Sequence, residues 1–106
     1  MIVTTTHSVE GREITQYLRV IAGETVAGIN LVKDFTAGFR NLVGGRSGSY
    51  EKELIQAREG ALAELVNRAN ELGADAVVGV ELDYAALGTH NDMLMVTATG
   101  TAVRLN

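Results

Sequence analysis

The residues of this sequence that could hold a metal ion are two histidines and a set of carboxylates, because the chain contains no cysteine. Soft heavy metals prefer thiolates, so the ligands that remain suit a divalent metal held by nitrogen and oxygen atoms. Glu81 and Asp83 are two residues apart, a spacing that places both on one face of a strand. The candidate ligands are His7, Glu81, Asp83, His90 and Asp92. Exposed loop histidines and solvated carboxylates are the commoner explanation, unless symmetry copies of the chain bring such groups together.

A glycine-rich stretch before the longest predicted helix is the second candidate site. Backbone amides in such a loop, together with a helix N-terminus and Arg46, could hold a small anion or phosphate. Neither the phosphate-loop pattern with its Lys-Ser/Thr ending nor the dinucleotide fingerprint is present. A tight turn whose Arg46 and Tyr50 contact a neighbouring subunit is therefore favoured over an anion site. The residues of this stretch are Gly44, Gly45, Arg46, Ser47, Gly48 and Tyr50.

Catalytic chemistry has little support in the sequence. There is no thiol nucleophile, and no histidine base lies near Ser47 or Ser49 in the sequence. Glu81 and Asp83 could act as an acid and base only if burial separated their pKa values. The chain is therefore expected not to be an enzyme, and an anion-handling enzyme or sensor built on the glycine-rich stretch is the remaining alternative.

The charge balance argues against nucleic acid and anionic membranes as partners. The net charge is −4, from 13 acidic and 9 basic side chains, and lysine occurs only at Lys33 and Lys52. Nucleic-acid binding relies on clustered Lys and Arg and on stacking aromatics, and the chain has no tryptophan. No apolar run approaches the roughly 18 residues that a membrane span needs, and no signal peptide is evident, so a cytoplasmic protein is expected.

The 106 residues fit one domain over residues 1–106, and the hydrophobic period predicts an α+β order of two strands, two helices and two strands. Gly73 is expected to end the longer helix, and a close neighbour is expected at Gly60 in its middle. Glu64 and Arg68 are spaced for an ion pair. The predicted elements are strands Ile2–Thr6 and Glu13–Thr25, helices Leu31–Val43 and Tyr50–Leu72, with Ser49 as cap, and strands Ala76–Tyr84 and Met93–Arg104.

The alternation of side chains along the strands predicts self-association. One long helix can cover only one face of a small sheet. Strict alternation puts Val78 and Val80 on one face of their strand. The opposite face is then half apolar and uncovered, which usually marks a place where another subunit packs. Its apolar residues are predicted to be Tyr17, Ile21, Val77, Met95 and Val103.

Three stretches resemble the YbjQ family of small bacterial proteins: the glycine-rich run 44–51, the segment 72–80, and 93–96 with 100–103. Together with Glu10-Gly11 and Gly23-Glu24, the likeness runs from about residue 2 to residue 103. The resemblance implies a dodecin-like subunit, with a helix packed on a three-stranded antiparallel sheet and extra short strands. It also implies a ring-shaped homo-oligomer, a pentamer, and a label of heavy-metal binding. The family supplies no catalytic residue, and Arg19 stands where its glycine is expected.

Overall fold

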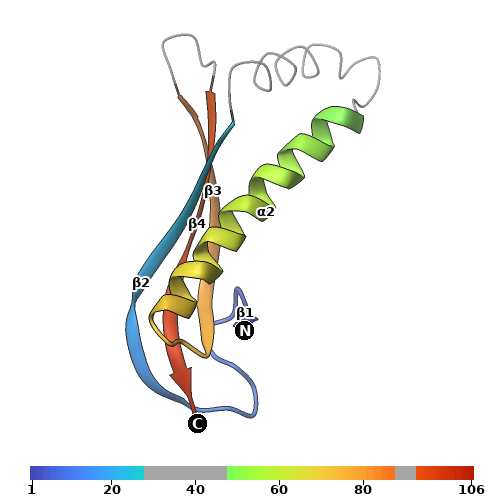
Figure 1. Cartoon of the computed structure of the whole chain (residues 1–106). Coiled ribbons are helices and arrows are strands. Elements are labelled where there is room, and N and C mark those ends of the chain that lie inside the picture. Colours follow the sequence, from blue (N-terminus) through green and yellow to red (C-terminus); the bar gives the residue numbers. More distant parts are fainter. Residues whose placement is uncertain (28–47, 88–92) are drawn as a thin grey trace.

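The computed structural model describes residues 1–27, 48–87 and 93–106, which form one helix on a mixed sheet of four strands. The strand order across the sheet is β1-β3-β4-β2, with the three long strands antiparallel and the short β1 parallel to β3. The parallel β1 makes the sheet mixed rather than purely antiparallel. Figure 1 shows the C-terminal half of the helix against the sheet and its N-terminal half running away from it. The elements are β1 (Ile2–Val3), β2 (Ile14–Ala27), α2 (Gly48–Glu71), β3 (Ala76–Leu87) and β4 (Met93–Leu105).

The first strand is shorter than its β-branched sequence predicts. Only Ile2 and Val3 pair with β3, although the run of threonines continues to Thr6. The Thr4 hydroxyl accepts a hydrogen bond from the Thr6 backbone N–H at 3.1 Å and lies 2.8 Å from the Thr6 hydroxyl oxygen. Such local side-chain bonds offer the backbone an alternative to the ladder, so the chain bends there. The predicted helix Leu31–Val43 lies outside the described residues.

The long helix is confirmed, and its end follows the expected chemistry. Gly73 has a φ of 73°, a conformation that suits glycine, and the Ala74 N–H donates to the Ala69 carbonyl at 3.1 Å. The helix begins at Gly48, so Ser49, expected as its cap, lies within the first turn. Its buried stripe consists of Ala57, Ala61, Leu65 and Ala69.

Two β-bulges overturn the predicted faces of the strands. Between Val78 and Glu81, β3 has one residue more than the segment of β4 that it pairs with. The bulge lies at Gly79, whose φ is 63°. Val77 and Val80 therefore both belong to the helix-side core, whereas Val78 lies in a second cluster on the other side. In β2 a similar shift between Tyr17 and Arg19 places Ile21 on the helix side as well. The predictions that Val78 and Val80 share a face, and that Ile21 and Val77 lie on the uncovered one, were wrong.

The second face of the sheet is partly sheltered by the chain itself. Val103, predicted to be uncovered, is fully buried in a small cluster against which Val9 of the N-terminal segment packs. That segment is tied to β3 by backbone hydrogen bonds, among them Gly79 N–H to the Thr6 carbonyl at 2.8 Å. Tyr17 remains 69% exposed and Val20 70% exposed. The uncovered part of this face is therefore smaller than the sequence predicts, and it has lost three of its five predicted apolar residues.

The helix approaches β2 most closely at a pair of glycines. A Cβ built on Gly23 would lie 2.3 Å from the Ala61 carbonyl oxygen and 2.5 Å from the Leu65 nitrogen, both of them backbone atoms of α2. A Cβ on Gly60 would lie 2.9 Å from the Thr25 hydroxyl, which confirms the close neighbour predicted for this helix position. Glycine at these two sites lets the helix cross the strand at short range and bury Leu65.

Candidate functional site

The predicted metal ligands that the structure describes, His7, Glu81 and Asp83, do not form a three-ligand group within one copy of the chain. Glu81 and Asp83 share the face of β3 that points away from the helix, and both are exposed. His7 lies on the N-terminal segment, with its ring within 3.4 Å of the place where a Cβ on Gly79 would be. Over residues 1–27, 48–87 and 93–106, no group of three or more His, Cys, Asp or Glu side chains is placed to hold a metal. His90 and Asp92 lie outside the described residues.

The glycine-rich stretch falls mostly outside the described residues. Gly44, Gly45, Arg46 and Ser47 belong to the part of the chain that is not described, and Gly48 and Tyr50 form the start of α2. The anion site and the subunit contact expected there both stay predictions.

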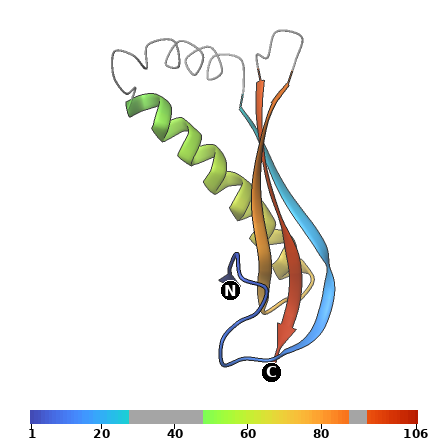
Figure 2. The ribbon, with the colours of Figure 1, turned by 180° about the vertical axis from the view of Figure 1, so that it is seen from behind.

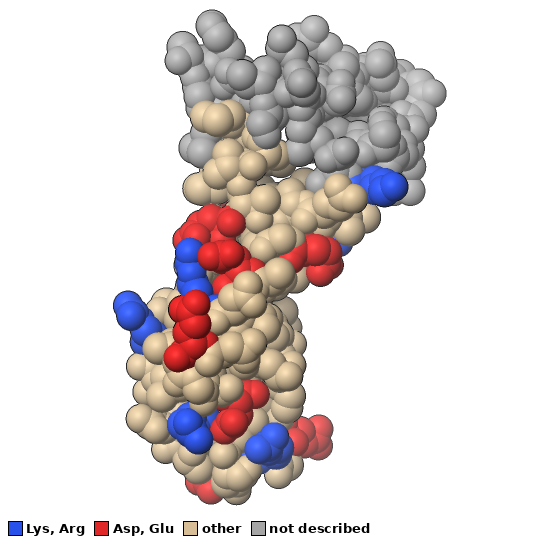
Figure 3. Space-filling model, in the orientation of Figure 1, with Lys and Arg blue, Asp and Glu red and all other residues tan. Residues whose placement is uncertain are grey.

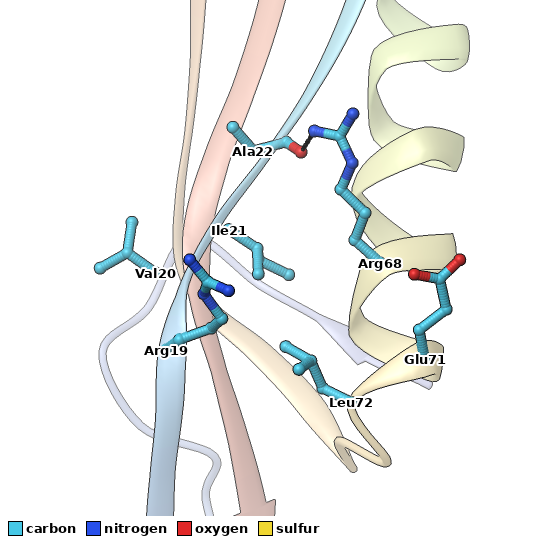
Figure 4. Close-up of a pocket in the computed structure, with 7 residues that line it drawn as sticks. All are labelled: Arg19, Val20, Ile21, Ala22, Arg68, Glu71 and Leu72. Atoms are coloured by element: carbon cyan, nitrogen blue, oxygen red, sulfur yellow. Dashed lines mark hydrogen bonds between the residues drawn. The ribbon is translucent and has the colours of Figure 1, made fainter.

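A hollow between β2 and α2 is the described site that sequence reasoning missed (Figure 4). Its cavity volume is about 350 Å³. That size is at the low end of the range of small-molecule pockets. The hollow lies beside the open edge of β2, near the C-terminal end of the helix. Its lining consists of Arg19, Val20, Ile21 and Ala22 from β2, Arg68 and Glu71 from α2, and Leu72 directly after the helix.

The bulge before Arg19 brings this arginine to the hollow. Arg19 pairs with Ala102, whose side chain belongs to the helix-side core. Side chains of paired residues in a sheet point to the same face, so the Arg19 guanidinium lies on the helix side of β2. Leu18 is an extra residue in this ladder. Strict alternation from Tyr17 would instead place Arg19 on the same face as Tyr17, away from the helix. No local sequence pattern indicates that a bulge occurs at this position.

Arg68 closes one section of the β2 edge. Its guanidinium donates a hydrogen bond to the Ala22 carbonyl and forms ion pairs with Glu24 at 3.0 Å and Glu64 at 3.3 Å. The pair with Glu64 is the one expected from the four-residue spacing. Because the Ala22 carbonyl points to the open edge, a neighbouring strand cannot pair with it while Arg68 is bound. Such edge protection is common in sheets that would otherwise associate.

A second, apolar hollow lies on the helix side of the sheet. It has a cavity volume of about 260 Å³ and lies where the N-terminal segment meets α2 and β3. Leu82 is 36% exposed beside it. The lining consists of Val3, Thr4, Thr5, Leu62, Val80 and Leu82. It has no charged side chain, and it can offer only apolar contacts and threonine hydroxyls.

The charged side chains of the visible face are interspersed rather than segregated (Figure 3). None of the described helices is long and apolar enough to cross a membrane.

Comparison with known proteins places the chain in a family. The family model described as "Putative heavy-metal-binding" matches residues 1–106. A UPF0145 protein of Corynebacterium jeikeium is 63% identical, and one of Clostridium botulinum is 58% identical, each over 97% of this chain and 97% of the relative. A crystal structure of a protein of unknown function from Pediococcus pentosaceus, of the DUF74 family, has a TM-score of 0.67 at 17% identity and covers 100% of this chain and 98% of that one. That likeness shows the fold. The match over the whole chain shows that this protein belongs to the YbjQ family, as its glycine-rich and strand motifs had indicated.

Proposed function

We propose that this protein works as a homo-oligomer, a dodecin-like pentameric ring that binds a small ligand or serves a structural role. The observation that supports the proposal most strongly is the pair of unpaired sheet edges on opposite sides of the subunit. The outer edge of β2 has no strand beside it among the described residues, and β1 covers only the beginning of β3. Long open edges are a liability that proteins remove by pairing them.

The geometry of the two edges suits a ring. One edge belongs to β2 and the other to residues 81–87 of β3, so pairing them between copies is a head-to-tail contact. Head-to-tail contacts generate rings when the rotation closes, and a closed sheet has no edges left. A two-fold dimer would join only one kind of edge and leave the other exposed.

Exposed apolar side chains near these edges support the same proposal. Val26 is 54% exposed on β2, and Tyr84 is 45% exposed on β3. The molecule described here is also thin, with principal extents of 51 × 27 × 15 Å. A subunit with so little depth buries less apolar surface than a compact domain of its length, and association adds to that burial.

The mass in solution tests the assembly. We expect light scattering after size-exclusion chromatography to give five times the chain mass of 11.3 kDa. Val26→Pro is expected to shift the population toward smaller species, because the Val26 N–H has the same outward direction as the Ala22 carbonyl. Proline at such a position removes an edge donor and leaves the pairing with β4 intact.

Val26→Thr is the matched control, since threonine keeps both the β-branched shape and the N–H. It is expected to keep the mass of the parent protein. A parent protein that elutes as a monomer of 11.3 kDa at micromolar concentration would contradict the proposal.

Metal binding is the second candidate, and the description of the matching family favours it. Glu81 and Asp83 are exposed on one face of β3, and no described residue of the same copy completes a three-ligand group with them, so copies of the chain could supply further ligands. Elemental analysis of protein purified without a tag tests this candidate. One divalent metal per subunit or per ring, lost in the double variant Glu81→Gln/Asp83→Asn and kept in Glu59→Gln, is the expected result. Equal metal contents in the two variants would rule out these two carboxylates.

A further inference from the structure

We propose that the hollow between β2 and α2 binds a small monocarboxylate with an apolar chain, held by Arg19. This inference rests on the proposed function, because it supplies a ligand class for the binding role. It differs from the expected anion site in the glycine-rich stretch, since none of its residues belongs to that stretch.

The charge of Arg19 has no partner among the described residues, whereas that of Arg68 is satisfied. Arg68 is engaged by the Ala22 carbonyl, Glu24 and Glu64. Arg19 makes neither a salt bridge nor a side-chain hydrogen bond with the described parts of the chain, although it lines the same hollow. Figure 4 shows its side chain along β2, across the hollow from Leu72 and Arg68. A guanidinium presents a planar fork of N–H donors that matches a carboxylate in two parallel hydrogen bonds.

The rest of the lining selects an apolar monoanion. Leu72 is 38% exposed beside the hollow and offers aliphatic surface to a ligand, and the buried Ile21, 7% exposed, adds an apolar lining. Glu71 lies on the helix side of the same hollow. Its negative charge opposes a second negative charge on the ligand, which disfavours phosphate and dicarboxylates. A monocarboxylate fits this lining, because its single negative charge can pair with Arg19 while its methylenes contact Ile21 and Leu72.

The open edge of β2 stays accessible at this place. Because Arg68 is bound to the Ala22 carbonyl, a strand from a neighbouring copy cannot pair with β2 there. The hollow and the proposed ring contacts can therefore exist in the same molecule. The ligand would lie beside the blocked section of the edge.

Calorimetric titration of the full-length protein with butyrate, hexanoate and octanoate at low ionic strength tests the proposal. We expect saturable binding that strengthens with chain length, because each added methylene contacts apolar surface. Arg19→Gln is expected to weaken hexanoate binding about tenfold, the typical effect of losing a hydrogen bond to a charged group. Arg19→Lys keeps the charge but loses the planar fork of donors, so its affinity for hexanoate should lie between those of the parent protein and Arg19→Gln.

Arg58→Gln is the matched control, since it removes one positive charge about 15 Å along the helix from Arg68. Unchanged hexanoate binding in this variant supports a specific site. Equal weakening in Arg58→Gln and Arg19→Gln, no dependence on chain length, or inorganic phosphate binding as strongly as hexanoate would each overturn the proposal. Light scattering on the same samples reports the assembly separately, so a monomeric parent protein and a ring without carboxylate binding are distinguishable results.

Discussion

Gly23→Ala is expected to lower the free energy of unfolding by about 3 kcal/mol, at the upper end of the usual cost of overpacking a core. The added Cβ would lie 2.3 Å from the Ala61 carbonyl oxygen and 2.5 Å from the Leu65 nitrogen. Both atoms belong to the helix backbone and cannot rotate away as a side chain can. The helix must instead move off β2, which also loosens Leu65 in the core beneath it.

Denaturant unfolding at fixed protein concentration measures this effect, because association would otherwise change the apparent stability. Gly60→Ala is the matched control from the same helix crossing. Its Cβ would lie 2.9 Å from the Thr25 hydroxyl, a side-chain atom that can turn aside. Alanine also favours the helix by up to about 1 kcal/mol over glycine. Gly60→Ala is therefore expected to be within about 1 kcal/mol of the parent, and equal losses in the two variants would contradict the account of the crossing.

Leu65→Ala is expected to cost about 3 kcal/mol, within the range measured for buried leucines truncated to alanine. Leu65 is fully buried between α2 and the sheet, and its cluster contains Ile21, Val77 and Val96 from three strands. Much of this cluster is alanine, so few side chains can move in to fill the space that Leu65 leaves. The loss of contacts and the remaining cavity both add to the cost.

The comparison for this variant is Leu72→Ala, at the residue that directly follows the end of α2. Leu72 is 38% exposed and lines the hollow, so its truncation removes less buried surface and is expected to cost about 1 kcal/mol. Thermal or denaturant unfolding of both variants measures how much each leucine contributes to the free energy of unfolding. A cost at Leu72 equal to that at Leu65 would show that the residue after the helix contributes as much to stability as the buried centre of the helix.

The path of the chain in Figure 2, seen from behind, places the N-terminal segment across the foot of the sheet. This arrangement explains why Val103, predicted to be uncovered, is buried. Val9 is separated from Val103 by most of the sequence, yet it packs against the cluster that contains this residue. A local stretch of sequence does not reveal this contact, because it depends on how the N-terminal segment after β1 folds back over one end of the sheet.

The sequence by itself determined the three long strands of the described chain and the C-terminal end of the long helix. The period of apolar residues is a local property, and so are the glycine at position 73 and the four-residue spacing of Glu64 and Arg68. Only the tertiary structure decided which side of the sheet each strand residue faces. The bulges at Leu18 and Gly79 each add one residue to a ladder, and one residue is enough to reverse every face beyond it. That reversal moved Ile21 and Val77 into the core and Arg19 into the hollow, because pairing between distant strands, and not local composition, sets the register.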